Sequence, residues 1–297
     1  MNDYAIEIKN LNKSYKDTNA VNNLNINVEK GKCYGFFGRN GAGKTTTIKC
    51  ILNHLTPDSG EIKVFGVSPQ KDEVKVKERI SYVPEEVSFY PWMTIKGTLD
   101  YLASFRGKWN KEIEKQLVDR FSLNPKQKVT NLSKGMKAQL SLIAAICAES
   151  EILLLDEPTS GLDPIVRREF LEVVIGAFQD VDPENRTIFV STHLINEFEG
   201  LIDQFTIIES GKNLLTLESE LARKKYKKIF LSFSNDVPDI NNKNIIKIKK
   251  QGRDAELLTN DFSEDLMNEL SKLSPLSTKV ENLTLEEIFV STSLLKG

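Results

Sequence analysis

The sequence predicts an α/β fold with a mainly parallel sheet, followed by a smaller α+β region. Three observations lead to this expectation. Short, fully apolar runs typical of buried parallel strands alternate with longer helical patterns. A glycine-rich loop joins one such run, residues 33–37, to a helical stretch at 46–55. Near residue 215 the pattern changes to short strands, so we expect a main domain over 1–215 and an accessory domain over 216–297.

The composition is typical of a globular protein that works inside the cell. Of its 297 residues, 40% are hydrophobic and 28% are charged, and the net charge of -2 gives no sign of a nucleic-acid-binding surface. No apolar stretch reaches the roughly 18 residues that span a bilayer, and the polar N-terminus begins no signal peptide. The cysteines, Cys33, Cys50 and Cys147, lie far apart in apolar segments, which indicates reduced, buried thiols of a cytoplasmic protein.

The first half of the chain begins with strands and continues with helices. Three stretches alternate between apolar and polar residues and are expected to be half-buried strands: 4–8, 24–28 and 61–65. A further short strand pattern at 80–84 ends at a proline. The stretch 95–148 is helical in pattern, because apolar residues recur there with helical spacing.

The second half returns to strands. Two fully apolar runs, 152–155 and 187–190, predict buried parallel strands, and Pro164 is well placed to open a helix between them. Residues 203–208, followed by a Ser-Gly-Lys turn, predict a hairpin. The accessory domain is expected to contain three short strands and one helix, at 228–233, 245–248, 255–258 and 262–273.

The glycine-rich loop has the spacing of a phosphate-binding P-loop, Gly38-x-x-x-x-Gly43-Lys44-Thr45. In such a loop the backbone N–H groups surround phosphate oxygens, and the helix that follows directs its positive end at the anion. Lys44 would supply a mobile positive charge, and the Thr45 hydroxyl could coordinate Mg²⁺. The alternative is an ordinary glycine-rich turn between two elements.

Two consecutive acids, Asp156 and Glu157, end the apolar run at 152–155. The carboxyl ends of parallel strands form the edge of the sheet where ligands bind. Asp156 suits a Mg²⁺ ligand, and Glu157 suits a base that activates water. The alternative is a strand that ends in an acidic turn.

Seven short motifs occur in order along the chain: Tyr15, the P-loop, Tyr82-Val83-Pro84-Glu85, Leu132-Ser133-Lys134-Gly135-Met136, Leu155-Asp156-Glu157-Pro158, Ser160-Gly161-Leu162-Asp163 and Ser191-Thr192-His193. Together they resemble an ABC transporter nucleotide-binding domain over about residues 4–215. P-loop kinases and small GTPases have no counterpart of the Leu-Ser-Lys-Gly-Met element. The resemblance implies a P-loop NTPase of the ABC type, with a RecA-like core sheet, an N-terminal antiparallel β region and a helical signature lobe.

The resemblance also implies roles at matching positions. ATP and Mg²⁺ would be bound, with Tyr15 stacked on adenine, although an ordinary tyrosine at a strand end is the alternative for that residue. Lys44, Glu157 and His193 would be the catalytic residues, with His193 at the γ-phosphate. The phosphates would be held by the loop and the start of its helix, at Gly38, Asn40, Gly41, Ala42, Gly43, Lys44, Thr45 and Thr46.

Members of this family work as head-to-tail dimers that enclose two ATP molecules. Ser133 and Gly135 would then contact the ATP of the opposite subunit, and Asp163 would lie where the subunits communicate. The resemblance therefore implies a homodimer, or a heterodimer with a related ATPase subunit. Two departures stand out: Lys134 and Met136 replace a Gly and a Gln of the usual signature, and Glu85 stands where many members carry Gln. Glu85 would place a third carboxylate near the metal, unless it is a solvated loop acid.

Residues 89–94, Phe-Tyr-Pro-Trp-Met-Thr, match a stretch that in the family forms a groove for a transmembrane subunit. We therefore expect docking to a separately encoded permease, on the inner face of the cell membrane, unless these aromatic residues only pack within the helical lobe. Glu85 and the stretch at 283–289 resemble the exporters of drugs, peptides and bacteriocins. A soluble ABC ATPase acting on ribosomes or DNA is the main alternative, but the chain has one P-loop and no long coiled coil. A nonhydrolysing regulator is opposed by the complete set of Asp156, Glu157 and His193.

Overall fold

The computed structural model describes residues 3–16, 18–179 and 186–295. The chain divides into two compact units, Met1–Asn213 and Leu214–Gly297, slightly before the change in pattern near residue 215. The two units are described separately. No helix in the described part of the chain combines the length and apolar character that crossing a membrane requires.

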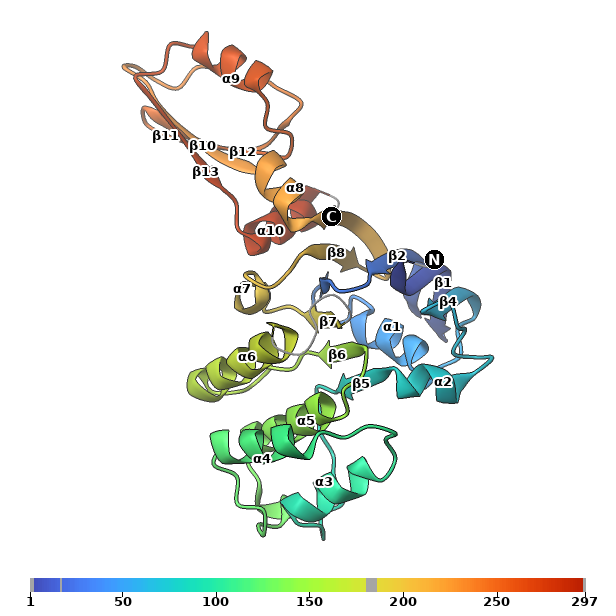
Figure 1. Ribbon diagram of the computed structural model, residues 1–297. Helices are drawn as coiled ribbons and strands as arrows, with labels where there is room; N and C mark the ends of the chain where they lie inside the picture. Colours follow the sequence, from blue (N-terminus) through green and yellow to red (C-terminus); the bar gives the residue numbers. More distant parts are fainter. Residues whose placement is uncertain (1–2, 17, 180–185, 296–297) are drawn as a thin grey trace. The chain divides into compact units, whose positions relative to one another are not determined.

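A sheet of six strands within the described residues has the order β5-β6-β7-β3-β8-β9 (Figure 1). Its first five strands belong to the first unit, whereas β9 runs across the boundary between Asn213 and Leu214. The first five strands run parallel, and β3, β6 and β7 are buried along their whole length. The prediction of an α/β fold with a mainly parallel sheet is therefore confirmed. The strands are β3 (Cys33–Phe37), β5 (Ile80–Val83), β6 (Ile152–Asp156), β7 (Thr187–Thr192), β8 (Gln204–Glu209) and β9 (Lys212–Glu218).

A second, antiparallel sheet has the order β2-β1-β4, with β1 at Tyr4–Tyr15, β2 at Thr18–Glu29 and β4 at Ser59–Val64. The sequence predicted only 4–8 and 24–28 for the first two strands, so their length was underestimated. Bulges interrupt the alternation, and two asparagine side chains hold the strands together there. Asn25 accepts the N–H of Asn10 at 2.9 Å, and Asn12 accepts the N–H of Asn23 at 2.8 Å.

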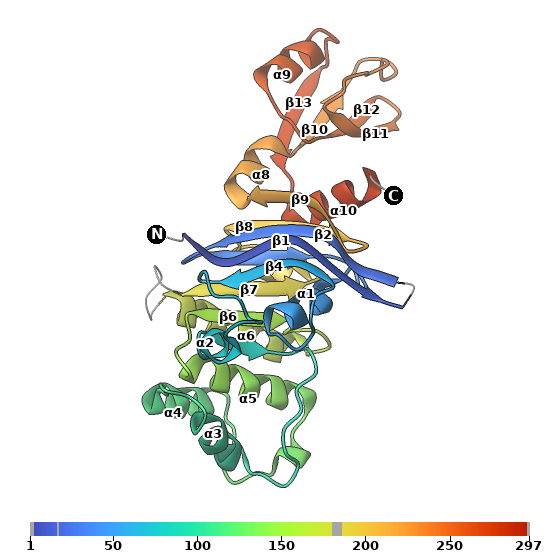
Figure 2. The same cartoon turned by 90° about the vertical axis from the view of Figure 1, so that its right-hand side faces the viewer.

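Helix α1 (Lys44–Ile51) lies between the two sheets (Figure 2). Its Ile48 and Ile51 belong to one continuous core with Ile8 of β1, Phe36 of β3 and Leu154 of β6. Side chains alternate along a strand, so the neighbouring residues of β6 face the opposite side, where α6 (Pro164–Gln179) lies (Figure 1). Both faces of the sheet are covered, which explains why its strands are apolar throughout.

The helical stretch predicted at 95–148 consists of separate helices: α3 (Ile95–Ala103), α4 (Lys111–Arg120), the 3₁₀ turn Val129–Asn131 and α5 (Lys134–Cys147). The three α-helices each begin at a capping side chain. Thr94, Asn110 and Ser133 accept the backbone N–H three residues further on. The shorter helices of this unit are α2 (Glu73–Glu78) and α7 (Ile195–Phe198).

The second unit is a small α+β structure with an antiparallel sheet in the order β11-β12-β10-β13. Helix α9 covers one face, and Leu266 and Leu270 share a core with Ile229, Leu231 and Leu257. The sequence analysis missed β13, because this edge strand is mostly exposed and carries no apolar alternation. The elements are α8 (Ser219–Lys225), β10 (Lys227–Ser232), β11 (Ile245–Gln251), β12 (Asp254–Thr259), α9 (Glu264–Ser271), β13 (Ser277–Asn282) and α10 (Leu285–Leu295).

A buried arginine joins the ends of two helices behind the parallel sheet. Arg186 donates to the backbone oxygens of Ile146 near the end of α5, of Ala177 near the end of α6, and of Ser150. Its side chain is only 6% exposed. The last carbonyls of a helix have no partner within the helix, and a cation there is favourable. The Ile146 carbonyl also accepts the N–H of Glu149 at 3.1 Å, so Arg186 adds a second donor to it.

We expect Arg186→Met to destabilise the first unit by about 3 kcal/mol, because it removes three buried hydrogen bonds from a charged donor. Urea unfolding followed by tryptophan fluorescence reports on this unit alone, since the two tryptophans of the chain are Trp92 and Trp109. Arg168→Met is the matched control, because the Arg168 side chain is 84% exposed and pairs with the exposed Glu172. Equal midpoints for the two variants would contradict the capping role.

Candidate nucleotide site

The glycine-rich loop leaves β3 at Phe37 and ends where α1 begins at Lys44. Gly43 has φ 107°, and a Cβ placed there would lie 2.2 Å from the carbonyl oxygen of Ala20 in β2. Only glycine fits, for both the backbone conformation and the space. The contact between Ala20 and Gly43 could not be predicted from the sequence, because Ala20 lies on a different strand and belongs to no recognised motif.

Lys44 is almost fully buried, at 5% exposure, and its ammonium group lies over the loop. It donates to the carbonyl oxygens of Gly38 at 2.7 Å and Arg39 at 3.3 Å. It also forms an ion pair with Glu157 Oε1 at 2.9 Å. The end of β6 and the start of α1 are thus joined by a direct charge contact.

Glu157 is held from the other side by Thr192, the last residue of β7, and by His193, which follows it. Its Oε2 accepts from the Nδ1 of His193 at 2.8 Å, from the backbone N–H of His193 at 3.3 Å and from the Thr192 hydroxyl at 3.2 Å. Since a carboxylate only accepts, the proton between Nδ1 and Oε2 resides on the imidazole. Glu157 has φ 45°, a left-handed conformation that is uncommon for a residue other than glycine. Its N–H bonds to the Ser191 carbonyl at 2.8 Å, which holds this turn in place.

Asp156, at 1% exposure, has no hydrogen-bond partner for either carboxylate oxygen among the described residues. Burial raises its pKa, the nearby charges of Glu157 and Glu85 raise it further, and the hydroxyls of Ser191 and Thr45 act in the opposite direction. A buried carboxylate beside a threonine hydroxyl offers the hard oxygen donors that Mg²⁺ prefers.

A cavity of about 360 Å³ lies above the loop. It is lined by Tyr15, Ala20, Asn40, Gly41, Gly43, Lys44, Thr45, Thr46, Glu85 and Glu157. The structure therefore brings most of the predicted phosphate and catalytic residues to one place, with Tyr15 half exposed at the end of β1. Glu85 is exposed at the rim, and no three metal-ligating side chains converge anywhere in the described residues.

Comparison with known proteins identifies the family. Residues 21–160 match the family described as ABC transporter. The bacitracin transport ATP-binding protein BcrA of Bacillus licheniformis is 36% identical over 77% of this chain and 74% of its own length. The chain belongs to the ATP-binding proteins of ABC transporters. The sequence prediction of an ABC ATPase that is most similar to drug and peptide exporter subunits is thereby confirmed.

Two further comparisons support the assignment to the ABC ATPases. The ABC transporter ATP-binding protein YtrB of Bacillus subtilis (strain 168) is 29% identical over 96% of this chain and 97% of its own length, so the similarity extends into the second unit. A solved structure of an ATP binding subunit of an ABC transporter has a TM-score of 0.66 and 26% identity. The matched region covers 74% of this chain and 92% of the chain in the solved structure.

Seven predicted residues of the ABC ATPase do not line the cavity above its P-loop. Gly38 and Ala42 belong to the loop itself, Asp156 precedes Glu157, and His193 contacts Glu157. The other three lie on α5 and α6. Ser133 caps α5, where its hydroxyl accepts the N–H of Met136 at 3.2 Å. Gly135 follows in the first turn of the same helix. Asp163 caps α6, where one carboxylate oxygen accepts two N–H groups at 3.1 Å. Among the described residues, none of the three lines the cavity, so one copy of the chain does not bring them to its own P-loop.

We expect Asp156→Asn to stabilise the nucleotide-free protein at neutral pH, because burial disfavours the charged carboxylate in the fold. The raised pKa of Asp156 means that the protonated form favours the fold and that this stability is lost as pH rises through the folded-state pKa. The gain in melting temperature over wild type should therefore be small at acidic pH and grow as pH rises, in buffer with a chelator. A gain independent of pH would show that the carboxylate charge is not its cause.

Proposed function

We propose that this ABC ATPase powers export through a separately encoded permease, as the peripheral subunit on the inner face of the cell membrane. The observation that carries ATP hydrolysis is the contact chain Lys44–Glu157–His193 beside the P-loop. Export is supported by relatives. Besides the bacitracin transport protein, the Nod factor export ATP-binding protein I of Burkholderia orbicola is 34% identical over 70% of this chain and 69% of its own length. A drug, an antimicrobial peptide or a similar amphipathic molecule is the proposed cargo.

In this proposal each side chain of the site has a separate role in binding or hydrolysing ATP. When ATP binds, Lys44 exchanges the loop carbonyls of Gly38 and Arg39 for the phosphate oxygens. The phosphates bind the ammonium group more strongly than the carbonyls do, because they carry full negative charge. Glu157, kept in place by His193, then polarises the attacking water. Asp156 and Thr45 would hold Mg²⁺, which when bound neutralises charge on the phosphates. Glu85, at the cavity rim, is proposed to reach the metal only in the nucleotide-bound protein.

Two copies of the cassette are proposed to close on ATP, as a homodimer or with a related subunit. Ser133 and Gly135 at the start of α5 support this, because the positive end of a helix suits a phosphate and neither residue lines the cavity of its own chain. All proposed chemistry lies in the first unit. We therefore propose that the second unit serves regulation, dimer support or partner contact.

Glu157→Gln is expected to lower the rate of ATP hydrolysis by roughly 100-fold or more, because the water loses its base. ATP affinity should stay within severalfold, since the loop is unchanged, and an ATP-dependent dimer should accumulate in size-exclusion chromatography. Phosphate release and nucleotide binding are the measurements. Glu151→Gln, at an exposed glutamate that pairs with Arg79, is the matched control. Hydrolysis near the wild-type rate in Glu157→Gln would refute the assigned role.

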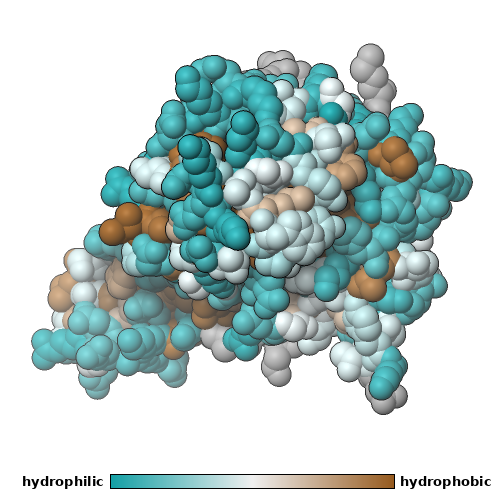
Figure 3. Space-filling view, turned by 90° about the horizontal axis from the view of Figure 1, so that it is seen from below, coloured by the Kyte–Doolittle hydropathy of each residue, from teal (hydrophilic) through white to brown (hydrophobic). Residues whose placement is uncertain are grey.

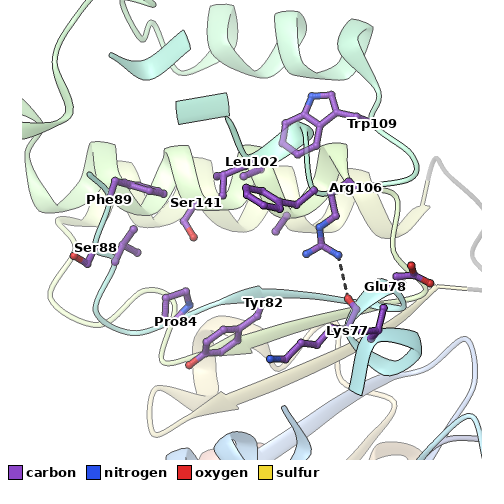
Figure 4. A pocket seen from close by; sticks show the side chains of 15 residues that line it. Lys77, Glu78, Tyr82, Pro84, Ser88, Phe89, Leu102, Arg106, Trp109 and Ser141 are labelled. Atoms are coloured by element: carbon purple, nitrogen blue, oxygen red, sulfur yellow. Dashed lines mark hydrogen bonds between the residues drawn. The ribbon is translucent and has the colours of Figure 1, made fainter. Parts of the chain in front are cut away.

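A second cavity, of about 500 Å³, is proposed as the docking groove for the permease. It lies between the end of β5, the loop that follows it and the helices α3 and α5 (Figure 4). Phe89 and Trp109 line it, and Arg106 points inward and donates to the backbone oxygens of Lys77 and Ile80, each at 3.1 Å. No carboxylate of the described residues forms an ion pair with Arg106, so an amphipathic permease segment with an acidic side chain would suit the groove.

Four aromatic rings form a ladder beside the groove. Tyr90 stacks on Trp92 with ring centres 4.9 Å apart and meets the edge of Tyr101 at 5.6 Å, and Tyr101 meets Phe105 at 4.9 Å. Trp92 and Phe105 are both 67% exposed. Seen from the helical end of the first unit, apolar patches stand out against a mostly hydrophilic surface (Figure 3). Exposed aromatic residues next to a groove favour a protein partner over internal packing.

The double variant Trp92→Ser/Phe105→Ser should reduce copurification with the permease at least tenfold and leave the ATPase rate of the isolated subunit within twofold. The reason is that buried aromatic anchors dominate interface energies, whereas neither ring touches the nucleotide cavity. Leu276→Ser, which changes a leucine of the second unit that is 72% exposed, is the control. Undiminished copurification of the double variant would exclude the ladder as a docking surface.

A further inference from the structure

A second glutamate, Glu197, contacts two other segments of the catalytic region. It lies in α7, four residues after His193. One carboxylate oxygen pairs with Arg167 Nη1 at 2.6 Å, and the other accepts the Thr159 hydroxyl at 2.5 Å. The side chain is only 13% exposed, so both contacts are largely shielded from water.

Both partners belong to the segment that follows the catalytic acid. Thr159 lies two residues after Glu157, is fully buried, and accepts the N–H of Leu162 through its carbonyl at 3.2 Å. Arg167, in the first turns of α6, donates to the carbonyl of Leu162 at 3.1 Å and bonds through its own N–H to the carbonyl of Asp163 at 3.0 Å. Glu197 therefore holds both ends of the loop that carries Asp163.

The position of Glu197 is in turn tied to His193. Helix α7 has only four residues, and Ile195 and Phe198 are buried at 1% and 0% exposure. A short helix anchored in this way moves together with the residues that precede it. These contacts close a ring. The backbone leads from His193 to Glu197, and the Glu197 side chain bonds to Thr159. The backbone then leads back from Thr159 to Glu157, which bonds to His193. The ring therefore connects the loop after Glu157 to the catalytic pair by covalent links and two hydrogen bonds.

We propose that Glu197 is a positioning residue that couples the Asp163 loop to the Glu157–His193 pair. When a second subunit contacts the loop at Asp163, the displacement reaches His193 through Glu197 and adjusts the catalytic carboxylate. This inference rests on the proposed dimer. It assigns Glu197 no contact with ATP, because the residues that line the nucleotide cavity do not include it.

A purely structural ion pair is the competing explanation. Arg167 argues against a pair optimised for stability, because its Nε is buried without a hydrogen-bond partner among the described residues. Removing one partner of a shielded pair destabilises proteins whether or not the pair has a functional role. Stability alone therefore cannot distinguish the two explanations, whereas cooperativity and the separation of ATP binding from turnover can.

The test compares Glu197→Ala, Glu197→Gln and Thr159→Val in the full-length protein. For Glu197→Ala we expect turnover at least tenfold lower, ATP affinity within threefold of wild type and a Hill coefficient for ATP close to one. Glu197→Gln keeps an acceptor for Thr159 and should recover turnover to within about threefold of wild type. Thr159→Val removes only the hydroxyl contact and should lose turnover in the same direction, which preserves the test if Glu197→Ala does not fold.

Glu172→Ala is the matched control, because it removes an exposed carboxylate of α6 that pairs with two arginines. This variant should change neither the turnover nor the Hill coefficient. Wild-type turnover and cooperativity in a folded Glu197→Ala would overturn the proposal, and so would a parallel loss of ATP affinity and turnover. Wild-type protein that hydrolyses ATP without cooperativity and forms no ATP-dependent dimer would instead overturn the proposed dimer, and the wild-type measurement alone shows this.

Discussion

The charge contact between Lys44 and Glu157 is the interaction on which the nucleotide site depends. Both side chains are 5% exposed, and removing two charges from water costs several kcal/mol for each unless other groups compensate. Here the compensation comes from two separate segments. The P-loop supplies carbonyl oxygens to Lys44, and the end of β7 supplies the Thr192 hydroxyl and the adjacent His193 to Glu157. These segments must therefore be placed accurately for the pair to exist at all.

The parallel sheet performs that placement. In the order β6-β7-β3, the strands that end at Asp156, Thr192 and Phe37 are direct neighbours, although they are far apart in sequence. Their carboxyl ends meet at one edge, so three loops deliver an acid pair, a histidine and a phosphate cradle to the same point. Core packing on both faces keeps the strands in register. The antiparallel sheet adds Tyr15 and Ala20 from the far side of α1.

The same arrangement connects the site to more distant surfaces. The loop after β5 lines both the nucleotide cavity, through Glu85, and the groove beside the aromatic ladder, through Phe89. The segment after β6 continues from Glu157 to Asp163 and is held by Glu197. A change in how Glu157 or Glu85 is bound can thus be transmitted along short, well-anchored segments, without a rearrangement of the sheet.

The sequence by itself determined the fold class and the family, because both depend on local patterns: apolar strands, and glycines, acids and hydroxyls at set offsets. It also indicated that the cysteines are buried, as the structure shows. Only the tertiary structure decided the contact of Ala20 with Gly43, the true length of β1 and β2, the edge strand β13 and the links of Glu197 to Thr159 and Arg167. Each of these depends on side chains or backbone from distant segments meeting in space. No spacing along the chain encodes such a meeting, because the packing of the whole unit sets the distance.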